Sequence, residues 1–357
     1  MRKAFIRGLI VFCALCMLAR MAWADQTTKQ EKLNSDLFDA MEDGDPFRVS
    51  RLLHDGADAN TQAFGLGTVL YVAAAYRRRD EVLDYDPVTN TWRVGKAPHL
   101  RIQDIERGIE KDPNDTTAEH LQIIELLLEY GAHIEARDPD TGKTPLMNAA
   151  EMGNRRSIEL LLEHGANMEA LDTRLGLTVL MYAVCNDHDD ANALALLQRG
   201  AKVNAKNQEG TTALMMAAAN LKANVALLLW YGADVNAHQS KTGRTALTNA
   251  ARFGCIDNVR LLLEHGADVN ARETDGTTAL MYAAKIGDPY LVPRYDLAKD
   301  AMIYTRKVGP YNTSDLVALL LAKGAKINAR DSHGFTALHY ARDPEIIRFL
   351  KRRGARK

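Results

Sequence analysis

Residues Asn258 to Ala284 read NVRLLLEHGADVNARETDGTTALMYAA, and closely similar phrases recur along the chain. They appear as SIELLLEHGANMEALDTRLGLTVLMYAV from Ser157 and as NVALLLWYGADVNAHQSKTGRTALTNAA from Asn224. A catalytic pocket needs singular residues at singular positions, whereas a phrase repeated at regular intervals needs a neighbouring copy of itself. The repetition therefore predicts an array of stacked units, each too small to bury its own apolar faces.

The glycine of each Gly-Ala pair marks the period of the repeat. These glycines are Gly56, Gly131, Gly165, Gly200, Gly232, Gly266, Gly324 and Gly354. Four successive spacings are 34, 35, 32 and 34 residues, and two longer ones are 75 and 58. Each longer spacing contains one period plus an insertion. We place the insertions at about 76–115 and 286–313, between the first and second helices of units 2 and 7.

Local signals within one unit predict two short helices and a reversal. Thr278 can cap the start of a helix whose apolar face includes Leu280 and Ala283. Three consecutive leucines in the second helix are too many for one amphipathic stripe, so this helix needs cover from more than one neighbour. Gly266 suits the left-handed residue that ends a helix, and Asn270 is expected to form the turn that follows.

A unit of about 33 residues that reads G-x-T-x-L-x-x-A-A, then a leucine helix, then G-A-x-V/I-N-A, resembles the ankyrin repeat. The resemblance implies an all-α repeat solenoid of about eight units over residues 33–357, with β-turn or hairpin loops between helix pairs. The family's Thr-Pro-Leu-His pattern is incomplete. Its proline occurs only at Pro145 and its histidine only at His339.

The first residues have the pattern of an export signal. A basic start, an apolar run from Leu9 to Leu18 and Ala22-Trp23-Ala24 predict a signal peptide over residues 1–24, cleaved between Ala24 and Asp25. The alternatives are an uncleaved anchor or a buried helix. A polar linker is expected at 25–32, and the mature chain is expected in the periplasm or outside the cell, with no membrane span.

Charge argues against nucleic acid as a partner. The whole chain has a net charge of −1, and residues 1–24 carry four basic and no acidic side chains, so the mature charge is −1 − 4 = −5. A weakly acidic chain without long basic runs lacks the electrostatic footprint of a nucleic-acid-binding protein.

Candidate chemistry is sparse. Cys185 and Cys255 fall two units apart, too far for a disulfide, so no bridge is predicted. His164 and His265 each end a helix, where a ring nitrogen can bond a terminal carbonyl group. The segment CNDHDD, residues 185–190, lacks a second Cys or His at ligand spacing, so we expect a solvated loop and no metal.

No hydrolase, phosphate-binding or zinc-protease motif is present in the sequence. We therefore expect no catalytic residue and no cofactor. A hydrolase that uses the first insertion, with His99 and Asp104 as its candidates, is the less favoured alternative.

The insertions carry aromatic residues that could contact a partner. Val82 to Gly95 predicts a hairpin with Tyr85 and Trp92 on its arms, and the second insertion contributes Tyr295 and Tyr304. The alternative is that both insertions cover helix ends without binding anything.

The resemblance also implies a binding surface on the concave face, formed by the reversal loops and first helices. Mapped onto this chain, the favoured contact residues are Tyr182, Arg244, Phe253 and Tyr282, because aromatic and arginine side chains dominate interface energies. For Tyr182 and Tyr282 the alternative is ordinary packing between neighbouring first helices.

The predicted function is a monomeric, non-catalytic protein-binding scaffold. Its partner would be an envelope protein, or a toxin delivered to the periplasm that the chain blocks as an immunity protein. The sequence identifies neither the partner nor the organism.

Overall fold

The computed structural model describes residues 29–63, 67–75, 81–86, 91–96, 117–185, 190–219, 224–285, 291–296, 301–306 and 313–357. The predicted signal peptide lies outside these residues. Residues 29–42 are helical, so residues 29–32 of the predicted linker belong to a helix. The chain forms two compact units, Met1–Ala166 and Asn167–Lys357. In repeat proteins each repeat contacts only its neighbours, so a boundary can fall between any two repeats.

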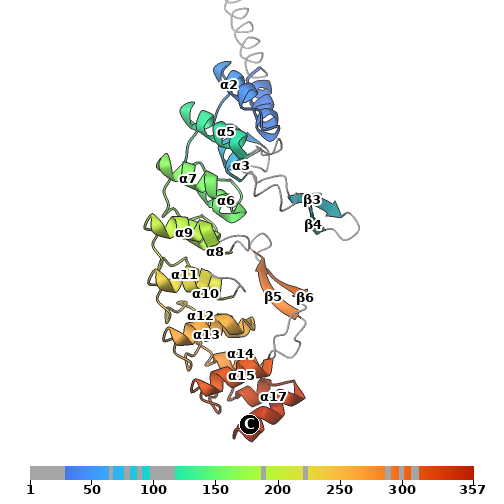
Figure 1. Ribbon diagram of the computed structural model, residues 1–357, viewed down its shortest axis with the longest axis vertical. Coiled ribbons are helices and arrows are strands. Elements are labelled where there is room, and N and C mark those ends of the chain that lie inside the picture. The colour runs from blue at the N-terminus through green and yellow to red at the C-terminus, as the bar shows by residue number, and fades with distance from the viewer. Residues whose placement is uncertain are drawn as a thin grey trace, which may run out of the picture. The chain divides into compact units, whose positions relative to one another are not determined.

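Unit 1 is built from paired helices with almost no sheet (Figure 1). Its first helices pack on each other, as α3 does on α6, and its second helices do likewise, as α5 does on α2 and α7. The labelled elements are α2 (Pro46–His54), β1 (Gln62–Ala63), β2 (Gly67–Thr68), α3 (Val69–Ala75), β3 (Glu81–Asp86), β4 (Thr91–Lys96), α5 (Thr117–Glu129), α6 (Pro145–Met152) and α7 (Arg155–Glu163).

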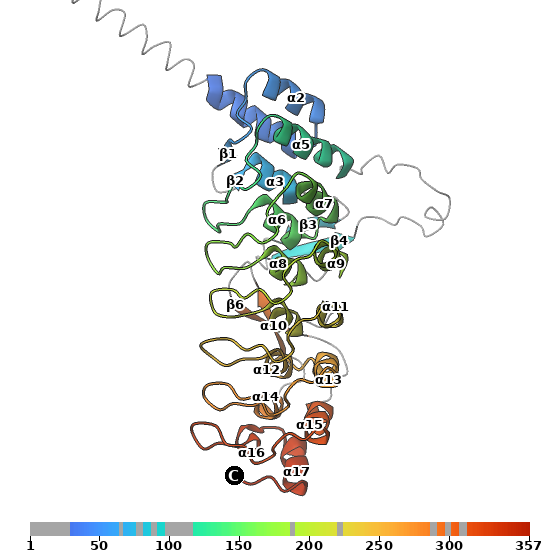
Figure 2. The same cartoon turned by 90° about the vertical axis from the view of Figure 1, so that its left-hand side faces the viewer.

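Unit 2 repeats the same pairing. First helices α8, α10, α12, α14 and α16 form one row and second helices α9, α11, α13, α15 and α17 another, with loops projecting beside the first row (Figure 2). The elements are α8 (Val179–Cys185), α9 (Asp190–Gln198), α10 (Ala213–Ala218), α11 (Asn224–Trp230), α12 (Ala246–Arg252), α13 (Ile256–Glu264), α14 (Ala279–Lys285), β5 (Leu291–Asp296), β6 (Ala301–Arg306), α15 (Thr313–Ala322), α16 (Ala337–Tyr340) and α17 (Pro344–Arg352).

The leucine triplet is explained by its burial. In α13 Leu262 is fully buried, whereas Leu261 and Leu263 are half-buried. The middle leucine belongs to the core, and α13 packs on both flanking second helices, α11 and α15. A row of such helices therefore buries leucine side chains that a single helix would leave exposed to solvent.

Local signals at the helix ends are confirmed. The Thr278 hydroxyl accepts a hydrogen bond from the Met281 N–H at 3.4 Å, as expected of an N-cap. Gly266 ends its helix with φ of 86°, a left-handed value that side chains other than glycine rarely adopt. These two residues fix where the first helix starts and the second helix stops.

Asn270 does more than form a turn. Its amide donates to the Gly324 carbonyl oxygen at 3.2 Å and accepts from the Lys326 N–H at 2.8 Å, both in the next repeat. In unit 1, Asn60 makes the equivalent bonds to Gly131 and His133. Each asparagine joins two repeats whose Gly-Ala pairs are separated by one of the two long spacings. Consecutive repeats therefore remain in contact although an insertion separates them in sequence.

Each insertion contains an antiparallel hairpin. Strands β3 and β4 pair Tyr85 opposite Trp92, as the hairpin predicted from the sequence requires. Strands β5 and β6 place Tyr295 opposite Met302 and Tyr304 opposite Pro293, a pairing that the sequence analysis did not anticipate. The side chains of both hairpins lie outside the described part of the structure.

Candidate binding surface

The loops that precede α8, α10, α12, α14 and α16 are here called the tips of unit 2. Each tip is joined to the next by a backbone hydrogen bond. The four bonds run from Gln208 N to Leu175 O (3.3 Å), Ser240 N to Glu209 O (3.1 Å), Thr274 N to Thr242 O (2.8 Å) and Ser332 N to Asp275 O (2.7 Å). The tips are therefore held in a continuous row.

Glycine is required where one tip approaches the next. Gly243 has φ of 70°, and a Cβ atom added there would lie 3.1 Å from the Thr274 backbone nitrogen. Both the backbone conformation and the lack of room favour glycine at this position.

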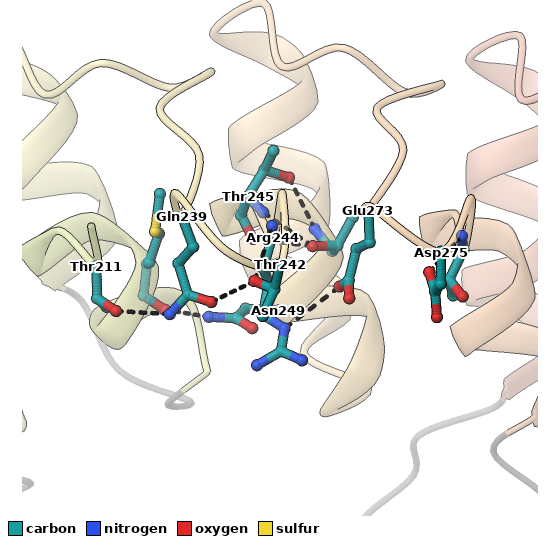
Figure 3. A network of polar contacts seen from close by, with 11 residues as sticks. Thr211, Gln239, Thr242, Arg244, Thr245, Asn249, Glu273 and Asp275 are labelled. Atoms are coloured by element: carbon teal, nitrogen blue, oxygen red, sulfur yellow. Dashed lines mark hydrogen bonds and ion pairs between the residues drawn. The ribbon is translucent and has the colours of Figure 1, made fainter. Parts of the chain in front are cut away.

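A network of polar side chains runs along the same row (Figure 3). Gln239 Nε2 donates to Thr211 Oγ1 at 2.5 Å, and Thr242 Oγ1 donates to Gln239 Oε1 at 2.6 Å. One tip further on, Arg244 Nε lies 3.3 Å from Glu273 Oε1, with 25% and 5% of the two side chains exposed. Because the bonds cross from tip to tip, they fix the side chains that the surface presents.

Buried carboxylates hold tyrosine hydroxyls beneath this surface. Asp172 is 3% exposed and accepts backbone N–H bonds from Leu175 and Leu177 at 2.7 and 2.8 Å. Its Oδ2 also accepts the hydroxyl of Tyr182 at 3.1 Å. Asp172 therefore orders its own tip and fixes the tyrosine of the following first helix.

Asp331 and Tyr340 repeat this arrangement in the last repeat. The Tyr340 hydroxyl donates to Asp331, and this bond, followed by burial, raises the pKa of Tyr340 to about 12. Burial alone would raise the pKa of Asp331, but hydrogen bonds from Tyr340, Phe335 and His333 together lower it. Tyr282 is similar, since burial and the adjacent Glu273 carboxylate raise its pKa.

Cations lie over these tyrosine rings. The Arg252 guanidinium carbon is 5.9 Å from the centroid of Tyr282, and Lys285 Nζ is 6.0 Å from that of Tyr340. Each cation ends one first helix and covers the ring on the next, within the range of cation–π attraction. We call Arg252, Tyr282, Lys285 and Tyr340 the cation–aromatic row. Across the residues that the structure describes, Arg252 and Lys285 form no ion pair with a carboxylate.

The structure separates the four residues predicted for the first-helix surface. Tyr182 and Phe253 are 4% and 8% exposed, so both pack inside and offer little side-chain surface to a partner. Arg244 is partly exposed but engaged by Glu273. Tyr282 is half-buried and belongs to the cation–aromatic row. For Tyr85, Trp92, Tyr295 and Tyr304 only the backbone is described, and their binding role stays a prediction.

Asn249 donates its amide N–H to the Met215 carbonyl oxygen of the preceding first helix at 3.0 Å. Sequence reasoning also missed the polar residue that opens each tip, which is half-buried at Asn207 and buried at the other four tips. Asp172, Asn207, Gln239, Glu273 and Asp331 follow the same spacing as the glycines, and that coincidence was the available signal.

The histidines at helix ends behave as predicted. His164 Nδ1 lies 3.0 Å from the Leu160 carbonyl oxygen, and His265 Nδ1 lies 2.9 Å from that of Leu261. His188 lies outside the described residues. In the described part of the chain, His, Cys, Asp and Glu side chains form no group of three suited to a metal ion.

Cys185 and Cys255 are thiols in the structure. Cys255 is buried at the start of α13, with its Sγ 3.6 Å from the Ala219 carbonyl oxygen. Cys185 ends α8. No described helix combines the length and the apolar character needed to cross a bilayer.

Comparison with known proteins agrees with this architecture. A family model described as ankyrin repeats (3 copies) matches residues 116–207, 169–239 and 214–299, which together span more than half of the chain. The crystal structure of the ankyrin repeat domain of Bcl-3, described as a unique member of the IkappaB protein family, is similar at 28% sequence identity. The match has a TM-score of 0.50 and covers 66% of this chain and 92% of that one. The chain belongs to the ankyrin-repeat family.

Proposed function

We propose that this protein is a non-catalytic scaffold that binds another protein through the tips and first helices of unit 2. Ankyrin repeats indicate a protein–protein interaction scaffold, and the cation–aromatic row carries the proposal for this particular surface. Tyrosine and arginine contribute most to interface energies when they are held rigidly. Here the Tyr340 hydroxyl donates to Asp331 and Tyr282 is half-buried, so little side-chain entropy remains to be lost on binding.

The compartment is part of the proposal. The basic start, apolar run and small-residue cleavage pattern of residues 1–24 support export, with action in the periplasm on an envelope protein. A toxin delivered to the same compartment is the second partner class, in which case the chain would act as an immunity protein.

The test is affinity capture from native envelope extract, with the purified chain beside two variants. Tyr282→Ala with Arg252→Ala alters the proposed surface, and Arg260→Ala changes an exposed residue on the second helix α13. We expect a stoichiometric partner that is retained by the wild-type chain and by Arg260→Ala but lost from the double variant.

Each other result has a defined meaning. A partner retained by the double variant moves the site to the hairpins, which deletion of residues 78–114 then tests. A captured toxin whose activity the chain abolishes identifies an immunity protein. Hydrolysis of an envelope substrate that depends on His99 or Asp104 would overturn the non-catalytic proposal.

A further inference from the structure

We propose that the cation–aromatic row binds a segment of the partner rich in aspartate and glutamate. The inference rests on the proposed function and adds the chemical class of the segment recognised. It follows from two observations about the row: its tyrosine rings are partly buried beside carboxylates, and the cations above them have no carboxylate partner among the residues that the structure describes.

The rings are partly buried beside carboxylates. The Tyr340 hydroxyl donates to Asp331. Tyr282 is half-buried, and its burial and the charge of the Glu273 carboxylate raise its pKa. Asp331 and Glu273 are each 7% exposed. The hydroxyl end of Tyr340 is therefore engaged inside the protein, and the rings of both tyrosines lie beneath the cations.

The carboxylates below the rings are already occupied. Asp331 accepts N–H bonds from His333 and Phe335, both at 2.9 Å, in addition to the Tyr340 hydroxyl. Glu273 binds the Arg244 guanidinium. Arg244 is therefore an example, on the same face, of a cation whose carboxylate partner lies within the protein.

Arg252 and Lys285 differ from Arg244 in this respect. Arg252 is half-buried and Lys285 is exposed, and both pair with aromatic rings instead of acids within the described chain. Each also ends a helix, where a cation suits the helix dipole. The dipole accounts for positive charge at these positions, but it does not supply a carboxylate partner for either cation. Carboxylates approaching from solvent would meet two cations held along one row, an arrangement that favours an extended acidic segment.

The experiment is selection of random twelve-residue peptides displayed on phage against the full chain, followed by fluorescence anisotropy with the enriched peptides. We expect enrichment of aspartate and glutamate. Arg252→Gln with Lys285→Gln should weaken binding about tenfold or more, because each charge-assisted contact contributes on the order of a kcal/mol. Binding should also weaken between low and high salt, since partly exposed charges are screened.

Arg348→Gln with Lys351→Gln is the matched control, because it removes the same charge from exposed positions on α17. Loss of binding in this control equal to that in the row variant would overturn the inference, since net charge alone would then explain it. Circular dichroism of both variants shows whether the fold is retained.

The remaining outcomes separate the inference from the proposed function. Peptides without excess acid that still require Tyr282 would overturn the acidic class and leave the scaffold function standing. If no substitution on this face changes peptide binding, or if no peptide is enriched, the result would count against both the acidic-segment inference and the proposed function. Tight binding of single-stranded oligo-dT through Arg252 and Lys285, with acidic peptides failing, would replace the inference with a nucleic-acid site.

Discussion

Equivalent positions in the two units carry opposite charges. In unit 1, Glu151 follows the alanine pair of α6 and bonds Lys143 of its own tip at 2.5 Å, with 15% and 14% of the side chains exposed. In unit 2, the same position after the alanine pairs holds Arg252 and Lys285, which lie over aromatic rings. At this position Glu151 is paired within unit 1, whereas Arg252 and Lys285 in unit 2 have no carboxylate partner among the described residues. The residue after the alanine pair occupies the same place in each of these repeats. The side chain at that place determines whether it forms an ion pair within the fold or is available to a partner.

The largest expected effect comes from breaking the pair in unit 1. Lys143→Met leaves the Glu151 carboxylate without this partner in a largely buried place, and we expect a loss of about 2 kcal/mol in the free energy of unfolding. Urea denaturation followed by circular dichroism measures it. Arg155→Met, which removes the more exposed pair with Glu159, should cost about 0.5 kcal/mol or less. Equal losses of unfolding free energy in the two variants would show that the Lys143–Glu151 pair contributes no more to stability than the exposed pair.

A smaller effect is expected from Tyr340→Phe in unit 2. Losing the hydroxyl that Asp331 accepts should cost about 1.5 kcal/mol, the range for a hydrogen bond to a charged group. The measurement is the same denaturation experiment at neutral pH. An unchanged unfolding free energy would mean that the backbone donors of Asp331 suffice.

The same tyrosine gives unit 2 a dependence on alkaline pH. The pKa of Tyr340 is raised from 10.0 to about 12, so the folded state holds this proton more tightly than the unfolded state does. The stability from this group is therefore complete below pH 10 and is lost as the pH rises to about 12. Phenolate absorbance should show a late-titrating tyrosine that Tyr340→Phe removes. A wild-type titration identical to that of the variant would contradict the assignment.

Arg252→Gln should have a smaller effect on stability than either change above. A partly exposed cation over a ring contributes on the order of 0.5–1 kcal/mol, and no buried charge is left behind. A loss as large as that from Lys143→Met would show that Arg252 is structural, and the contrast between the units would fail.

The smallest effect is expected at Trp230, which is 86% exposed at the end of α11, where the next repeat has Glu264. Trp230→Glu should change the unfolding free energy by no more than about 0.5 kcal/mol. Loss of the captured partner in this variant would place a contact on the second helices, outside the proposed surface.

Much of this fold could be predicted from the sequence because its signals are local and repeated. The Thr278 cap, the Gly266 helix end and the bonds of His164 and His265 each depend on residues within one turn of a helix. Each signal recurs in phase, so one correct assignment extends to the others.

The candidate surface could be predicted less well. The sequence placed Tyr182 and Tyr282 at the same position of the repeat and could not distinguish them, yet Tyr182 is buried and Tyr282 is half-buried beside Arg252. The difference arises from side chains that adjacent repeats contribute, which lie about one period away in sequence.

By itself, the sequence determined the period, the helix pairs and the family, because each unit repeats the same local signals and must stack to bury its leucines. Only the tertiary structure decided that Asn270 ties one repeat to the next, that Glu273 engages Arg244 and that Arg252 is left over a ring. Those outcomes depend on which groups approach within a few ångströms across a repeat boundary. Hydrogen bonds and ion pairs are that short in range, so a pattern along the chain cannot assign their partners.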